Sequence, residues 1–197
     1  MVMAETRDRL LATTAELFQR QGFNGTSMKQ ITDGAEATTG SLYHFFPGGK
    51  DELAAEVIRT AGAGYLELFQ LMTAVAKTSA DAISMLFDGA AATLEQSDYV
   101  DACPIFTVAL EVASADEALR RSCDDVFGTW RATATAMFRK DGLAPKAANA
   151  LAATVIAALG GAFILARTAQ DADLMRAIGR NMTAHVDAAT NGRSLQR

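Results

Sequence analysis

The residues best suited to chemistry lie in one stretch, Thr38 to Leu53, which reads T-T-G-S-L-Y-H-F-F-P-G-G-K-D-E-L. Thr and Ser near the start of a helix can hydrogen-bond the base edges of DNA, and Tyr43 and His44 can donate to phosphate oxygens. Gly40 costs roughly 1 kcal/mol against alanine within a helix, and close approach to a phosphate chain would offset that cost. The stretch favours contact with DNA. The alternative is a small packing bundle with Tyr43 half buried and His44 solvated.

Other chemistries fit the sequence less well. Gly48-Gly49-Lys50 resembles the end of a P-loop, but that motif needs glycine at 44 and Ser or Thr at 51, where the chain has His44 and Asp51. The side chains that zinc prefers are scattered without paired spacing: His44, Cys103, Cys123 and His185. His44 also has no obvious acid beside it to orient it as a base. We therefore expect no metal, no cofactor and no enzymatic activity.

Helices must position the stretch. The chain has 197 residues, half of them apolar, with three prolines and no sustained alternation of Val, Ile and Thr, which predicts an all-α fold. Residues 5–21 have an amphipathic helical pattern that Gly22 ends. Ser27 and Gln30 have the spacing of a capping box at the start of a short second helix. Thr38 is a good N-cap for a third helix of barely two turns. The second and third helices have the layout of a helix-turn-helix.

Six longer helices are expected downstream. Ser, Pro, Gly and Asp residues separate helical patterns with the expected bounds 50–77, 79–97, 104–114, 116–141, 145–170 and 172–190. The total is about nine helices. We expect two domains, a helix-turn-helix domain at 1–49 and a larger helical domain at 50–197.

The span Leu10–Leu53 resembles the N-terminal domain of the TetR/AcrR family of transcriptional repressors. The matching motifs are Ala15-x-Leu17-Phe18, Gly22-Phe23, Thr26-Ser27, Ile31, the run from Gly40 to Phe46, and the helix start at Lys50. The resemblance implies that Thr39, Gly40 and Ser41 reach bases. It implies that phosphates are held by Ser27, Thr38, Tyr43, His44 and Lys50. It also implies a repressor that a small effector releases from its operator. Because few charges fall on the apolar faces of the downstream helices, we expect that effector to be lipophilic.

The charge pattern departs from what DNA binding usually requires. The net charge is −5, and the first fifty residues hold five basic and five acidic side chains. Glu36 stands at the turn position usually given to glycine, and Thr39 stands where lysine is frequent in the family. We therefore expect modest non-specific affinity and a shallow salt dependence.

The alanine-rich helix expected at 145–170 has the length of a bilayer span. Its many small residues predict instead a helix buried on both sides, with a second subunit supplying one side. The family resemblance implies that the helix at 145–170 and the helix at 172–190 form half of a four-helix bundle in a homodimer. A two-fold dimer would read a palindromic operator. The interface residues expected are Leu151, Val155, Gly160, Gly161, Leu174, Ile178 and Met182.

The resemblance also implies an effector pocket among the downstream helices. Met and aromatic side chains adapt to apolar ligands, although most of these residues could equally be core. The candidates are Phe69, Met72, Phe106, Leu110, Glu111, Phe127, Trp130 and Phe163. Glu111 would be a polar contact for the effector, or alternatively the partner of Arg120 or Arg121 in a salt bridge.

A second function stays open, that of a helical small-molecule carrier or scaffold without DNA binding. Glu36, Thr39 and the absence of a basic surplus favour it. Cys103 and Cys123 lack CxxC spacing and are typical of reduced residues in a cytosolic core. No charged segment followed by an apolar run opens the chain, so we expect a cytoplasmic location.

Overall fold

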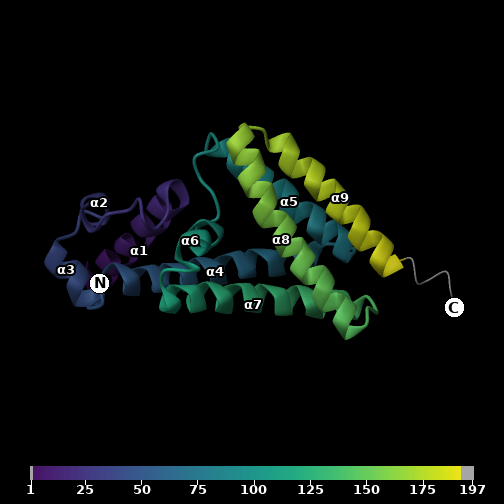
Figure 1. Cartoon of the computed structure of the whole chain (residues 1–197), viewed down its shortest axis with the longest axis horizontal. Coiled ribbons are helices and arrows are strands. Elements are labelled where there is room, and N and C mark those ends of the chain that lie inside the picture. Colours follow the sequence, from purple (N-terminus) through teal and green to yellow (C-terminus); the bar gives the residue numbers. More distant parts are fainter. Residues whose placement is uncertain (1, 192–197) are drawn as a thin grey trace. The chain divides into compact units, whose positions relative to one another are not determined.

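The computed structural model describes residues 2–191, which form nine α-helices and no strand (Figure 1). The all-α prediction is confirmed. The helices are α1 (Val2–Gln21), α2 (Met28–Gly34), α3 (Thr39–Phe45), α4 (Lys50–Val75), α5 (Ser79–Gln96), α6 (Pro104–Val112), α7 (Glu117–Lys140), α8 (Pro145–Ala169) and α9 (Ala172–Asn191). The expected bounds differ from these by one to three residues at most ends.

The chain packs as two compact units. Among the described residues, unit 1 holds those up to Gly64 together with Asp101–Val126, and unit 2 holds Tyr65–Val100 together with those from Phe127 to Asn191. Helices α4 and α7 each contribute one part to unit 1 and another to unit 2. Packing thus divides the chain differently from the functional boundary expected at 49/50, which stays a prediction.

Local signals set the helix ends in unit 1. Gly22 adopts a φ of 74° and its N–H donates to the Phe18 carbonyl, at 3.1 Å. The rings of Phe18 and Phe23 then meet edge to face, 5.9 Å apart, the apolar contact that such a glycine turn favours. At α2 the Ser27 hydroxyl accepts from the Gln30 N–H, and the Gln30 side chain accepts from the Ser27 N–H. The predicted capping box is present.

Close backbone packing joins α4 to α7 within unit 1. A Cβ atom added at Gly62 would lie 2.6 Å from Val126 Cγ1. Only glycine fits there, because ordinary carbon contacts are about 3.5–4.0 Å. Arg7 of α1 adds a polar tie to α4 by donating to Glu56, at 2.6 Å. The first contact ties α7 to the first part of α4, and the second ties α1 to it.

Unit 2 is built on α5, α8 and α9, and α5 lies along α9 there (Figure 1). A Cβ atom at Gly179 of α9 would lie 2.5 Å from Phe87 Cβ of α5, so these two helices also approach at a glycine. Arg167 donates to the Tyr99 and Val100 carbonyls, which fixes the chain that follows α5. The result is a layer of helices with a continuous apolar core.

Helix α8 passes the length and composition test for a membrane span, and no other helix within residues 2–191 does so. In this structure 33% of its most apolar window is buried inside the protein. The rest of that window is half-buried or exposed, so the chain by itself does not bury α8 on both sides, and burial of the other side by a second subunit stays a prediction.

Candidate nucleic-acid interface and effector residues

Helix α3 is held from one side and exposed on the other. Leu42 and Phe46 are buried beneath it, whereas Thr39, Gly40 and His44 are exposed and Tyr43 keeps 50% of its surface accessible. Phe45 is only half buried and meets the His44 ring edge to face at 5.1 Å. Phe46, at the C-cap, is the second anchor because the chain turns inward there.

The hydroxyl groups at the start of α3 are organised by capping. Thr38 Oγ1 accepts from the Ser41 N–H at 3.0 Å and lies 2.9 Å from Ser41 Oγ. Thr38 is exposed and Ser41 is half buried. The two side chains therefore have fixed positions, and Thr39 and Gly40 between them face outward. This arrangement can present hydroxyl groups to an incoming polar surface.

The turn between α2 and α3 contains a strained residue. Glu36 is exposed with a φ of 49°, a conformation that glycine adopts without cost. This position is the one where the family resemblance leads us to expect glycine. Ser27, at the start of α2, is also exposed, and its hydroxyl is engaged in the capping box.

Lys50 is engaged inside unit 1. Its Nζ lies 4.0 Å from the centre of the Phe23 ring, a cation–π contact. Burial lowers the pKa of Lys50, and the nearby carboxylates of Asp51 and Glu111 oppose that change. The phosphate contact expected of Lys50 would have to compete with these partners.

All five basic side chains of the first fifty residues have partners within unit 1. Two are paired with carboxylates of other helices or loops, Arg7 with Glu56 and Arg20 with Asp101. The other three contacts are Arg9 to the Ala35 carbonyl, Lys29 to Asp33, and Lys50 to the Phe23 ring. The sequence has no surplus of basic residues in this region, and in the structure each of its cationic side chains already contacts another group of the protein.

The salt bridge suggested for Glu111 is not formed. Arg120 and Arg121 both bind Glu117, each at 2.8 Å, and lower the pKa of its carboxyl to about 2. These arginines lie three and four residues after Glu117 on α7, the spacing that favours ion pairs on a helix. Glu111 instead accepts a hydrogen bond from the Asn24 N–H, at 2.6 Å.

The candidate effector residues divide between the units. Phe106, Leu110 and Glu111 belong to unit 1, where Leu110 is 73% exposed. The candidates in unit 2 are Phe69, Met72, Phe127, Trp130 and Phe163. There, Phe127 and Trp130 meet edge to face at 5.7 Å. Tyr65, which the sequence reasoning missed, meets Trp130 at 6.2 Å. Its place on the same face of α4 as Phe69 and Met72 was the available signal.

The candidate dimer residues also divide. Four of them pack within unit 2 itself: Leu151, Val155, Gly160 and Met182. Gly161 and Leu174 are exposed and Ile178 is half buried, so these three keep surface for another subunit. Ile164 and Leu165, exposed at 52% and 54%, were missed because the apolar pattern of α8 continues around the whole helix.

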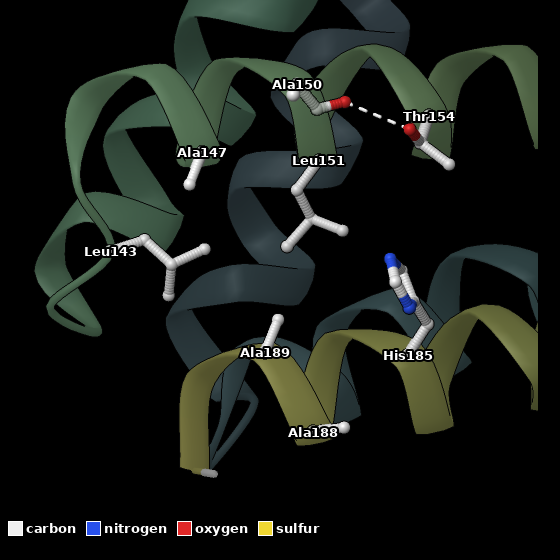
Figure 2. Close-up of a pocket in the computed structure, with 8 residues that line it drawn as sticks. All are labelled: Leu143, Ala147, Ala150, Leu151, Thr154, His185, Ala188 and Ala189. Atoms are coloured by element: carbon white, nitrogen blue, oxygen red, sulfur yellow. Dashed lines mark hydrogen bonds between the residues drawn. The ribbon is translucent and has the colours of Figure 1, made fainter. Parts of the chain in front are cut away.

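A shallow groove of about 460 Å³ lies between α8 and α9. Figure 2 shows Leu143 and Leu151 extending from the α8 side, opposite His185 of α9. The remaining lining residues are small or carry a short side chain: Ala147, Ala150, Thr154, Ala188 and Ala189. In the described part of the chain, no three His, Cys, Asp or Glu side chains gather to hold a metal ion.

Two family models match the chain. "Bacterial regulatory proteins, tetR family" matches residues 10–57, and "Transcriptional regulator LmrA/YxaF-like, C-terminal domain" matches residues 79–181. A Bacillus subtilis (strain 168) protein, the uncharacterised HTH-type transcriptional regulator YxaF, is 32% identical over 167 residues, covering 85% of this chain and 87% of the relative. The HTH-type transcriptional regulator LmrA of the same organism is 26% identical over 171 residues, covering 87% and 91%.

Solved structures agree on the fold. A TetR transcriptional regulator from Chloroflexus aurantiacus J-10-FL superposes with a TM-score of 0.80 at 25% identity, covering 94% of this chain and 96% of the other. The TetR-family regulator CifR, as a cysteine mutant in a structure with 26 bp double-strand operator DNA, has a TM-score of 0.77 at 20% identity, covering 90% and 95%. The two family models and the match to YxaF together span most of this chain, and the chain therefore belongs to the TetR family of HTH-type transcriptional regulators.

Proposed function

We propose that this protein is a cytoplasmic repressor that binds a palindromic operator as a homodimer and is released by a small lipophilic molecule. It has no enzymatic activity. The observation that carries the proposal is the exposed face of α3, where Thr39, Gly40 and Tyr43 stand outward over a buried Leu42. The fold shared with CifR, whose structure includes operator DNA, supports the same interpretation.

The presence of glycine at position 40 is the most specific observation in favour of contact with DNA. A Cβ atom added there would meet only Thr38 Oγ1 among the described residues, at the ordinary distance of 3.7 Å. Packing within the protein therefore does not require glycine, although glycine costs about 1 kcal/mol against alanine in a helix. The close approach of a phosphate chain or base edge explains the missing side chain.

Gly40→Leu tests this directly. The variant is expected to stay folded, because the site is open, and to lose a retarded band in a gel shift with DNA from upstream of the protein's own gene at low salt. Gly64→Leu is the matched control, since no atom of the described residues lies within 4 Å of a Cβ there. A Gly40→Leu protein that binds this DNA as well as the wild type would refute the assignment of α3.

The dimer is proposed from the outer faces of α8 and α9. Gly161, Ile164, Leu165 and Leu174 leave apolar surface uncovered there, and contiguous apolar surface marks interaction sites. Gly161→Arg adds a charge where no described atom lies within 4 Å, so the subunit itself is not disturbed. The variant is expected to sediment as a monomer and to lose operator binding, and a dimer that still binds would contradict the interface.

The effector is proposed to bind near the aromatic cluster of Tyr65, Phe127 and Trp130 in unit 2. Edge-to-face rings suit a planar, weakly polar ligand. Trp130 is the single tryptophan, so its fluorescence reports binding directly. Planar lipophilic compounds that quench Trp130 should release the DNA at the same concentrations, and quenching without release would contradict the regulatory role.

A carrier or scaffold without DNA binding is the second candidate. The internal pairing of all five basic residues near the helix-turn-helix favours it. Compounds that quench Trp130, in a protein that retards no DNA at low salt, would establish this alternative.

A further inference from the structure

A carboxylate of α6 reaches into the turn that follows α1. Glu111 Oε2 accepts from the Asn24 N–H at 2.6 Å. Its other oxygen fills the space beside Gly22, because a Cβ atom added at Gly22 would lie 1.7 Å from Glu111 Oε1. Gly22 is thus constrained twice, by its φ of 74° and by the carboxylate that occupies its side-chain position.

The same carboxylate acts on the start of α4. Lys50 Nζ lies over the ring of Phe23, the residue between Gly22 and Asn24. Glu111 is close enough to favour the charged form of Lys50. One side chain of α6 therefore contacts the end of α1 and acts electrostatically on the first residue of α4. A second tie lies nearby, where Arg20 of α1 pairs with Asp101 at 3.3 Å, shortly before α6 begins.

These contacts join segments that belong to different homology domains. Gly22 and Asn24 lie in the span matched by the tetR-family model, residues 10–57, while Glu111 lies in the span matched by the LmrA/YxaF-like C-terminal model, residues 79–181. All three residues pack in unit 1. A shift of α6 along or about its axis would break a short hydrogen bond to the turn that leads into α2.

We propose that Glu111 is a positioning residue for DNA binding, which fixes the turn between α1 and α2 and thereby couples the helix-turn-helix to α6. This rests on the proposed function. Glu111 was a candidate effector contact in the sequence, and the geometry directs its carboxylate to the helix-turn-helix instead. The hydrogen bond from the Asn24 N–H to Glu111 forms when α6 is in place and breaks when α6 moves, so it couples the position of α6 to that of the turn.

Three variants separate positioning from simple stability. Glu111→Ala removes the acceptor, Glu111→Gln keeps an acceptor oxygen without the charge, and Glu117→Ala is the control that breaks an exposed ion pair in the same unit. Operator affinity is measured by gel shift on DNA from upstream of the protein's own gene, at a temperature where thermal unfolding curves show every variant fully folded. Glu111→Ala is expected to bind about tenfold more weakly, the fold-change of one hydrogen bond to a charged group. Glu111→Gln should recover most of that loss, and Glu117→Ala should bind as the wild type.

A folded Glu111→Ala protein that binds the operator as tightly as the wild type overturns the proposal. If the wild type itself retards no DNA, the proposed function has failed, and hydrogen exchange decides the positioning role separately. The Asn24 amide is expected to exchange faster in Glu111→Ala than in the wild type or in Glu117→Ala. Equal exchange in all three proteins would show that Glu111 does not order the turn.

Discussion

Two glycines of α4, Gly62 and Gly64, allow the cost of close helix packing to be measured apart from the cost of glycine in a helix. Gly62 and Gly64 are two residues apart but have different surroundings. A Cβ atom added at Gly62 would lie 2.6 and 2.7 Å from the two methyl carbons of Val126, whereas a Cβ atom added at Gly64 would have no described atom within 4 Å. Carbon atoms in contact are normally about 3.5–4.0 Å apart. Alanine at 62 therefore forces a shift of about 1 Å between α4 and α7, and alanine at 64 forces none.

The magnitude follows from the same change made at both positions. Replacing glycine by alanine in a helix stabilises by about 1 kcal/mol, so Gly64→Ala should raise the free energy of unfolding by that amount. At Gly62 the same gain is opposed by overpacking, which costs typically about 1–3 kcal/mol. The propensity gain cancels between the two variants. Their difference in stability, about 1–3 kcal/mol in favour of Gly64→Ala, measures the overpacking alone.

Thermal and urea unfolding of the two variants provide the assay. A difference of 1 kcal/mol shifts Tm by about 2–4 °C in a chain of this size, so Gly62→Ala should melt several degrees below Gly64→Ala. Adding Val126→Ala to Gly62→Ala should narrow the gap, because it removes the methyl carbons that the new Cβ meets. Equal stabilisation by both alanines would refute the close approach of α4 to α7.

Three further predictions concern single side chains. Glu36 has a φ of 49°, which costs a non-glycine residue about 1–2 kcal/mol. Glu36→Gly should therefore raise the free energy of unfolding by up to about 1 kcal/mol, after the greater freedom of glycine in the unfolded chain is subtracted. Glu36→Gln should leave the urea midpoint unchanged, and an equal rise in the stability of both variants would contradict the backbone explanation. Hydrogen bonds from Arg59 and Arg7 lower the pKa of Glu56 from 4.5 to about 2, so these pairs stabilise the fold above about pH 4.5 and cease to do so as the pH falls toward 2. Glu56→Gln should therefore cost about 1 kcal/mol at pH 7, because the arginines are partly solvated, and a gap that stays constant in urea titrations from pH 7 down to pH 3 would contradict the pairing. Burial raises the pKa of Cys103 and of Cys123 to about 11, so both thiols stay protonated near pH 8; Ellman's reagent should label neither in the native protein and both in urea, and rapid native labelling of either would contradict their burial.

Local sequence signals predicted the elements of the site. The Ser27–Gln30 capping box and the Thr38 N-cap are interactions within four residues, and both form as expected. Gly22 likewise ends α1 in the left-handed conformation. These signals succeed because each helix end is satisfied by its own neighbours in sequence.

Long-range partners were the part that the sequence did not predict. Glu111 binds the Asn24 amide, 87 residues away in the chain, and Lys50 lies against Phe23. No periodicity reports such contacts. The partner of Arg120 and Arg121 was predictable, because Glu117 stands at helical spacing from both. The error was to pair them with Glu111, which lies on a different helix.

The internal use of cations near the helix-turn-helix constrains how this protein can bind DNA. Non-specific affinity comes from Lys and Arg that release counterions from phosphates, and here Arg7, Arg20 and Lys50 are held by Glu56, Asp101 and Phe23. Base recognition by the proposed face of α3 then depends on neutral hydroxyl groups, whose hydrogen bonds require accurate placement. A protein that relies on placement more than on charge is sensitive to any contact that sets the position of its helix-turn-helix. For this reason a single hydrogen bond from Glu111 to the turn after α1 can have a large effect on binding. The same argument requires a shallow salt dependence, and a slope equivalent to more than about eight phosphate contacts per dimer would contradict it.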